Sequence, residues 1–371
     1  MADGNTPNTQ DDKEKVYVKI SHLKPGSILK GQTFTDEGKK LFPAYHVFND
    51  EDIQTLVSRG LEKIYYIPVQ ETIAERSKQE GLAFMTKLMD SVKSGRGVDI
   101  GHARQVVDLM ISDIYSGEIG MVNLLGLKDY SEYAYVHSIN VSILSMVFAR
   151  KMGLEEKDVR EVGLGGMLHD VGKINTPADI LWKIDGDSDY ERTIIHEHPM
   201  FGYKILESSG NVPESVLKIV VGHHECYDGS GYPGKLTDKN IDRNVKIVSL
   251  CNYYDYLVEK AEGKESVSPR EAVMKIMQMS GKEFNPMFIN DFVTDLSFLL
   301  LENPLYPPGS MVLLDTREIA LVMEVKKYSD LKPLVKILSG SDGKKMARPI
   351  VVDLKNDNKR HIERIVKLTG S

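Results

Sequence analysis

The sequence predicts a mainly α-helical protein, in which a central set of helices is flanked by a small N-terminal α+β domain and a C-terminal β-rich segment. Apolar residues recur with helical spacing through most of residues 123–302, whereas shorter alternating runs bounded by Gly and Pro occupy residues 16–70 and 303–371. The chain has 371 residues, a length that favours about two or three domains over one.

The N-terminal part begins with a polar, acidic stretch, residues 1–15, which predicts a disordered head. Four runs within residues 16–70 are typical of strands: VYVKI, SILKGQTF, KKLFPAYHVF and EKIYYIP. The run NDEDIQTLVSRG predicts a short helix, with Asn49 or Asp50 as the N-cap and Gly60 as the stop. This domain contains no cluster of acids, bases or metal ligands, so a sensor, docking or packing role stays open.

Residues 71–122 predict two amphipathic linker helices, around LAFMTKLMDSV and ARQVVDLMISDIY, whose Met and Leu repeats are typical of core. The helical domain that follows is broken by the Gly/Pro-rich run DGSGYPG. Pro307, Pro308 and Gly309 then mark a boundary before four further strand-like runs, MVLLD, IALVMEV, LVKIL and RPIVVDL.

Composition excludes some classes of protein. The formal net charge is −7 and there is no long basic run, so we expect no binding to a nucleic-acid polymer, although a small anionic ligand is compatible. The only cysteines, Cys226 and Cys251, predict no disulfide framework. The first fifteen residues lack an apolar core and no window reaches eighteen apolar residues. We therefore expect a cytoplasmic protein without a membrane span.

Histidines are concentrated in the helical region. Of the ten in the chain, six lie between positions 137 and 224: His137, His169, His196, His198, His223 and His224. One histidine alone is more often a core or surface residue than a ligand, but a group of this size indicates a metal site.

The run EVGLGGMLHDVGK places His169 and Asp170 next to each other at the end of an apolar helix, where glycines allow close approach of neighbouring backbones. An imidazole and a carboxylate can share one divalent ion, and a carboxylate can bridge two. Lys173 follows one turn later, placed to face a phosphate oxygen. His223 and His224 would diverge by about 100° on a helix, so that one could bind metal while the other holds substrate or a second ion.

Four runs follow one another along the chain in this order: VHSINV, HDVGK, HPMFG and HHECYDGSGYPG. By these runs, the chain resembles the HD-GYP branch of the HD superfamily of metal-dependent phosphohydrolases. The resemblance covers about half of the chain. It implies a bundle of helices around two or three divalent metal ions, often iron or manganese. It also implies hydrolysis of the bacterial messenger cyclic di-GMP.

The resemblance further implies a role for each matching residue. The first metal would be held by His137, His169 and Asp170. Asp170 would also bridge to a second metal, held by His198 and by His223 or His224. The catalytic residues would be Asp170 and Lys173, and the substrate-binding residues would be Gly231, Tyr232, Pro233 and Lys264. His196 has no place in the pattern and is expected to be a surface histidine.

The chain departs from the family pattern at the last ligand of the first metal. Asn252 stands where the family has an aspartate, and Asp255 matches a second aspartate that is not the ligand. An amide oxygen brings no negative charge, so we expect a weakened first site.

Other departures concern substrate charge and the number of metals. Cys226 and Ala261 occupy positions where arginines are usual. Tyr133 stands where three-metal members have a glutamate ligand, and Glu132 points to another helix face, so two metals are expected rather than three.

The sequence therefore predicts a cyclic di-GMP phosphodiesterase with two divalent ions, iron or manganese. An alternative is a catalytically impaired relative that binds a cyclic dinucleotide, or a protein partner through the loop around Tyr232. A phosphohydrolase with another substrate is a third possibility, and a purely structural scaffold is disfavoured by the six histidines.

Overall fold

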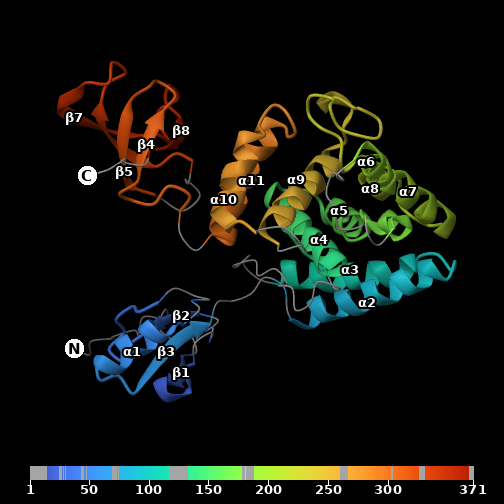
Figure 1. The fold of residues 1–371 in the computed structure, drawn as a ribbon, viewed down its shortest axis with the longest axis horizontal. Coiled ribbons are helices and arrows are strands. Elements are labelled where there is room, and N and C mark those ends of the chain that lie inside the picture. Colours follow the sequence, from blue (N-terminus) through green and yellow to red (C-terminus); the bar gives the residue numbers. More distant parts are fainter. Residues whose placement is uncertain are drawn as a thin grey trace, which may run out of the picture. The chain divides into compact units, whose positions relative to one another are not determined.

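The computed structural model describes residues 15–366, apart from the short segments 25–26, 28, 30, 43–45, 47, 69–72, 74, 117–132, 178–179, 181–187, 260–265, 302–303 and 326–330. The chain divides into two compact units, Met1–Glu71 and Thr72–Ser371. The predicted fold class is confirmed: the protein is mainly helical, with a three-stranded N-terminal sheet and a five-stranded C-terminal sheet (Figure 1).

The first unit contains an antiparallel sheet in the order β1-β3-β2, formed by Val16–Lys19, Lys63–Pro68 and Gly31–Phe34. A short 3-10 helix, η1 (Ile20–His22), follows β1. Helix α1 (Asp50–Ser58) has Asn49 as its N-cap, which is one of the two N-caps that the sequence predicts, and the Asn49 side chain forms a capping box with Asp52. The core of this unit is apolar; its fully buried members are Ile20, Leu23, Phe48, Leu56 and Ile64.

The strand predicted over residues 39–48 is wrong for the part of it that the structure describes. Its described residues include an isolated bridge between Phe34 and Lys40, and backbone hydrogen bonds join Leu41 and Phe42 to Thr33. The rings of Phe42 and His46 stack with centroids 4.5 Å apart. Four residues of extended strand would separate them by about 13 Å. The described residues of this run therefore form no continuous strand.

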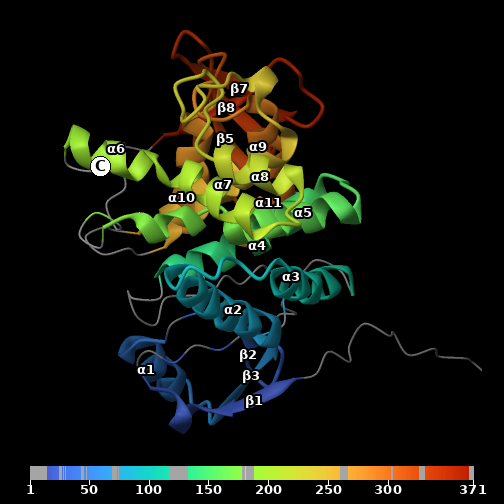
Figure 2. The same ribbon diagram turned by 90° about the vertical axis from the view of Figure 1, so that its right-hand side faces the viewer.

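The second unit begins with the helices of the bundle. Their bounds are α2 Glu75–Lys93, α3 Ile100–Tyr115, α4 Tyr133–Lys151, α5 Glu156–Leu168, α6 Asp189–His196, α7 His198–Ser209, α8 Glu214–Gly222, α9 Arg243–Val258, α10 Pro269–Gln278 and α11 Pro286–Leu300. Two further 3-10 helices are η3 (Val171–Asn175) and η4 (Asp238–Asn240). Helices α2 and α3 lie side by side in both views (Figure 1, Figure 2).

Helix α4 is the centre of the bundle. All its residues from Val136 to Ala149 are buried, which fits a stretch whose apolar residues occur all round the helix. Helices α5 and α9 pack against it, and α8 packs on α5 (Figure 2). The ends of α4, α5, α7 and α8 position the candidate site.

The C-terminal part is an antiparallel sheet in the order β7-β6-β5-β4-β8. The four predicted strands are confirmed as β4 Met311–Leu314, β5 Ile319–Glu324, β6 Leu334–Ser339 and β7 Lys345–Asp353. Strand β8 (Ile362–Ile365) was not predicted, because charged residues interrupt its short apolar pattern. None of the helices in the described part of the chain has the length and hydropathy that a membrane crossing requires.

Candidate metal centre

The candidate ligands lie at the ends of helices that meet around Asp170. His137 is near the start of α4, and His169 and Asp170 directly follow α5. His198 is the first residue of α7, and His223 follows the end of α8. All five are buried, so the helix ends bring polar groups together inside the bundle.

Gly172 permits the approach of α7 to the residues that follow α5. A Cβ at this position would overlap the carbonyl oxygen of His198. The expectation that glycines near the His169-Asp170 pair allow close backbone approach is therefore confirmed at Gly172.

The two carboxylate oxygens of Asp170 face different histidines. Oδ2 lies 3.3 Å from Nε2 of His169 and 3.8 Å from Nε2 of His137. Oδ1 lies 3.3 Å from Nε2 of His198 and 3.6 Å from Nε2 of His223. The carboxylate thus stands between two sets of imidazoles, an arrangement suited to bridging two cations.

Among the described residues, two groups have ligand atoms close enough to hold a metal ion. The first group is His137, His169 and Asp170, and the second group is Asp170, His198, His223 and His224. The predicted divergence of His223 and His224 does not occur: their ring centroids are 4.2 Å apart, and both belong to the second group. Helix α8 ends at Gly222, so the 100° helical spacing does not apply to them.

Backbone carbonyls orient three of the rings. The Nδ1 atom of each lies within hydrogen-bond distance of the carbonyl oxygen three residues earlier, at 2.8 Å for His169, 2.6 Å for His198 and 2.9 Å for His223. A carbonyl oxygen only accepts, so Nδ1 must carry the proton and donate. In the neutral ring, Nε2 then presents its lone pair toward Asp170, which is how histidine binds a metal.

His137 is oriented by a carboxylate instead. Its Nδ1 lies 2.7 Å from Oδ2 of Asp255, a fully buried residue of α9. Asp255 therefore acts on the far side of the His137 ring, with Nε2 left to face Asp170. A carboxylate behind a metal-binding histidine fixes its tautomer and raises its basicity.

The donor set fits a metal pair. The Nε2 atoms of His198 and His223 are 3.2 Å apart, although both rings already use their Nδ1 protons. Two lone pairs at this distance repel unless a cation lies between them and the carboxylate. Asp170 Oδ1, His169 Nε2 and His224 Nε2 are also buried without a hydrogen-bond partner in the described structure. Such orphaned atoms are the expected sign of a bound ion.

Burial sets the protonation of the site. It lowers the pKa of His198 and of His223 to about 4, and it also lowers the pKa of His169. Burial by itself would raise the pKa of Asp170, but His169 and Lys173 outweigh it and hold that pKa well below its usual range. Neutral imidazoles around an ionised carboxylate are the protonation state that binds a divalent cation.

Lys173 lies on η3, and its Nζ is 2.6 Å from Asp170 Oδ2. Its side chain is partly exposed. Lys173 thus contacts the shared carboxylate, and the predicted contact with a phosphate stays a prediction.

Tyr232 lies between two imidazoles. Its ring stacks on His196 with centroids 3.7 Å apart and on His224 at 4.6 Å, both nearly parallel. The expectation that His196 is a surface histidine without a role is therefore wrong: it is partly buried and covers one face of Tyr232. The pattern of motifs could not reveal this, because the contact joins the end of α6 to a loop far along the chain.

The other predicted residues fall in three places. Gly231 is buried, and Pro233 is exposed on the same loop. Asn252 is partly buried on α9, one turn before Asp255. Lys264, Ala261 and Glu132, and the side chain of Tyr133, lie outside the described residues.

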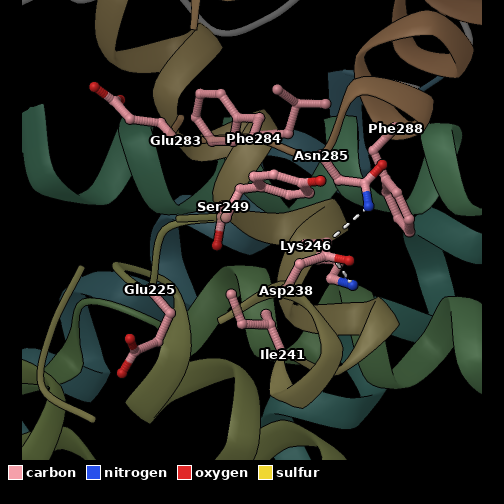
Figure 3. A pocket seen from close by; sticks show the side chains of 11 residues that line it. Glu225, Asp238, Ile241, Lys246, Ser249, Glu283, Phe284, Asn285 and Phe288 are labelled. Carbon is pink, nitrogen blue, oxygen red and sulfur yellow. Dashed lines mark hydrogen bonds and ion pairs between the residues drawn. The ribbon is translucent and has the colours of Figure 1, made fainter. Parts of the chain in front are cut away.

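A cavity of about 10 Å³ lies beneath this loop and does not touch the histidines. It is lined by Glu225, Asp238, Lys246 and aromatic residues near the start of α11 (Figure 3). Its volume holds about one water molecule, so it is a packing feature and not the substrate site.

Sequence reasoning missed the roles of Asp255 and Glu225. Both are buried carboxylates inside the quoted motifs. An acidic residue in an apolar helix was the available signal for Asp255, whereas Glu225 lies after the end of α8.

Two parts of the chain match known families of domains. Residues 110–287 match the family model described as an HD domain, and residues 311–370 match the model of a KOW domain associated with the HD domain. A cyclic di-GMP phosphodiesterase of Pseudomonas aeruginosa is 30% identical over 272 residues, which are 73% of this chain and 64% of the relative.

Two further relatives are similar over shorter shares of their lengths. A cyclic di-GMP phosphodiesterase of Thermotoga maritima is 33% identical over 45% of this chain and 46% of the relative. A 3'3'-cGAMP-specific phosphodiesterase of Vibrio cholerae is 25% identical over 71% of this chain and 46% of the relative. The chain thus spans less than two thirds of the length of each of these relatives.

Proposed function

Because residues 110–287 match the HD-domain model, we propose that the chain is a metal-dependent phosphodiesterase of the HD-GYP type that hydrolyses cyclic di-GMP. The observation that carries this proposal is the position of Asp170, whose two oxygens face two separate histidine groups. The names of the Pseudomonas and Thermotoga relatives support cyclic di-GMP as the substrate.

In this proposal, His137, His169 and Asp170 hold one divalent ion, and Asp170 with His198, His223 and His224 holds the other. Mixed imidazole and carboxylate donors suit iron and manganese, which we propose as the metals. Asn252 completes the first site as a neutral donor, so this site has less ligand charge than an aspartate would provide.

The bound ions would lower the pKa of a water molecule and neutralise charge on the phosphate oxygens. The protein's own residues position the two ions, exclude water and add positive charge. Asp170 keeps the two sites at a fixed separation, and the buried helix ends exclude bulk water. Lys173 adds positive charge beside the phosphate, where negative charge develops in the transition state.

The loop that includes Gly231, Tyr232 and Pro233 borders the second group. Both faces of the Tyr232 ring are covered by imidazoles, so we propose that Tyr232 meets the substrate through its hydroxyl edge and not by stacking on a guanine. Lys264 remains a proposed second basic contact.

The second candidate function is binding without turnover. Asn252 and Cys226 favour it, because the first weakens the predicted metal site and the second removes a positive charge from the predicted substrate site. Such a protein would act as an effector that senses a cyclic dinucleotide.

Incubation of the Mn²⁺-loaded full chain with cyclic di-GMP, followed by chromatography, tests the proposal. We expect linear dinucleotide or GMP from the wild type and from Glu207→Gln, a control at an exposed carboxylate of α7. Asp170→Asn should form no product. Saturable cyclic di-GMP binding without product in the wild type would favour the effector, and absence of both would contradict each candidate.

A further inference from the structure

We propose that Tyr232, held by the loop that Glu225 anchors, positions His224 as a ligand of the second metal. This inference rests on the proposed function, since it assigns a role toward a metal that His224 would hold. Toward the metal, Tyr232 and Glu225 are positioning residues, because they act through the His224 ring; the proposed substrate contact of Tyr232 uses its hydroxyl and not this ring stack.

His224 differs from the other histidines of the two groups in how its ring is held. The rings of His169, His198 and His223 each donate from Nδ1 to a carbonyl, and His137 is bound to Asp255. In the described part of the chain, no hydrogen bond reaches the ring of His224, and its Nε2 is buried without a partner. Its orientation therefore depends on ring contacts.

The nearly parallel contact among these is with Tyr232. The two ring planes differ by 13°, with centroids 4.6 Å apart, which is the geometry of a stacked pair. His196 covers the opposite face of Tyr232, so the tyrosine ring is fixed from both sides. Tyr232 thus takes the place that a carbonyl or carboxylate takes behind the other ligands.

The backbone of the loop holds Tyr232 against the end of α8. The Tyr232 N–H donates to the carbonyl oxygen of His224 at 3.1 Å. A Cβ at Gly231 would overlap the same carbonyl oxygen and the backbone nitrogen of Cys226. Glycine at 231 is therefore required for the contact that brings Tyr232 onto His224.

Glu225 anchors the other end of this loop. Its carboxylate is buried and accepts two backbone N–H groups, from Gly234 at 2.5 Å and from Leu236 at 2.8 Å. A buried carboxylate is costly without such bonds, so the loop and Glu225 stabilise each other. Figure 3 shows the Glu225 side chain beside the cavity beneath the loop.

The base of the loop is also fixed. Asp238 accepts from Nζ of Lys246 and from Nδ2 of Asn285, each at 2.9 Å (Figure 3). The Tyr227 N–H donates to the carbonyl oxygen of Glu283 at 2.9 Å. The loop is therefore tied to α9 and to the start of α11, and the Tyr232 ring has a rigid support.

The first test is Mn²⁺ titration of the full chain, with wild type, Tyr232→Ala and Tyr232→Phe compared, and with Tyr203→Ala as the control. Tyr203 lies on α7 and bonds to Glu207, away from the histidines. Loss of the ring should weaken the second metal by about 10–100-fold, as is typical of outer-shell residues. Tyr232→Phe should retain the affinity, because it keeps the ring.

The second test follows the loop itself. Glu225→Gln should speed amide hydrogen exchange at Gly234 and Leu236 by about tenfold or more and weaken the second metal, whereas Glu207→Gln should change neither. Circular dichroism establishes that each variant is folded. If Glu225→Gln does not fold, the Tyr232 variants still decide the proposal.

The outcomes separate this inference from the proposed function. A wild type that binds no Mn²⁺ contradicts the proposed function. Wild type and Tyr232→Ala with equal second-site affinity overturn only the positioning role. Tyr232→Phe as weak as Tyr232→Ala also overturns it, since the hydroxyl and not the ring would then matter.

Discussion

The two groups of candidate ligands around Asp170 are held in place by different contacts. In the first group, His137 is backed by the buried carboxylate of Asp255. In the second group, His198 and His223 are backed by neutral carbonyls, and a third imidazole is added. The first group therefore has a negatively charged residue behind one of its ligands, whereas the second group has one more imidazole.

This difference changes the meaning of Asn252. In the proposed first site, a neutral amide in place of an aspartate would remove a negative charge, but the Asp255 carboxylate supplies one behind the His137 ring. We therefore expect the direct ligands of the first site to bind metal more weakly, with partial compensation from Asp255. The second site has no such dependence.

The largest loss of bound metal is expected from changes to Asp170, which belongs to both ligand groups, and to its neighbour His169. The double variant His169→Ala, Asp170→Ala should lose both metals and all hydrolysis, well beyond the roughly 10–100-fold loss typical of outer-shell changes. Helical circular dichroism should persist, because removing the carboxylate also removes a buried charge. Retained metal stoichiometry in the double variant would contradict the role of Asp170.

Asp255→Asn should act on one group only. The amide no longer balances charge behind His137, so the first metal should bind about 10–100-fold more weakly while the second is unchanged. Two-step Mn²⁺ titration measures both, with Asp189→Asn on the exposed start of α6 as the control. An equal loss at both sites would mean that Asp255 supports the bundle and not the His137 ring.

Asn252→Asp should act in the opposite direction. An added carboxylate should tighten the first site roughly tenfold, since ligand charge count governs affinity for hard divalent ions. Hydrolysis at limiting metal should rise accordingly. A variant that gains metal but no activity locates the defect in substrate binding, and one that gains neither shows that Asn252 is not at the ligand position.

Metal removal should also lower the stability of the folded chain. A ligand that binds only the folded state stabilises it by about 2.7 kcal/mol at a concentration one hundred times its Kd. Chelation should therefore lower the thermal midpoint of the wild type, and less so in Asp255→Asn. Identical midpoints with and without metal would argue against a site inside the folded bundle.

The sequence was sufficient for features that depend on neighbouring residues. The His169-Asp170 pair, the cap at Asn49 and the C-terminal strands follow from local pattern, and each lies where it was expected. The described residues of the run 39–48 form no continuous strand, and the rings of Phe42 and His46 stack on each other, a contact that the local alternation does not predict.

Contacts between distant segments could not be predicted in the same way. His137 and Asp255 are 118 positions apart, and nothing in either motif says that α4 and α9 pack together. The stack of His196 on Tyr232 likewise depends on how α6 is placed against a loop. Such pairs require the tertiary structure, which is why the sequence predicted the ligands better than the residues behind them.

Anomalous X-ray diffraction from crystals of the Mn²⁺-loaded full chain tests the central claim most directly. We expect two anomalous peaks, one beside Asp170 Oδ2 with His137 and His169, and one beside Oδ1 with His198, His223 and His224. A single peak, or peaks that do not share Asp170, would contradict it.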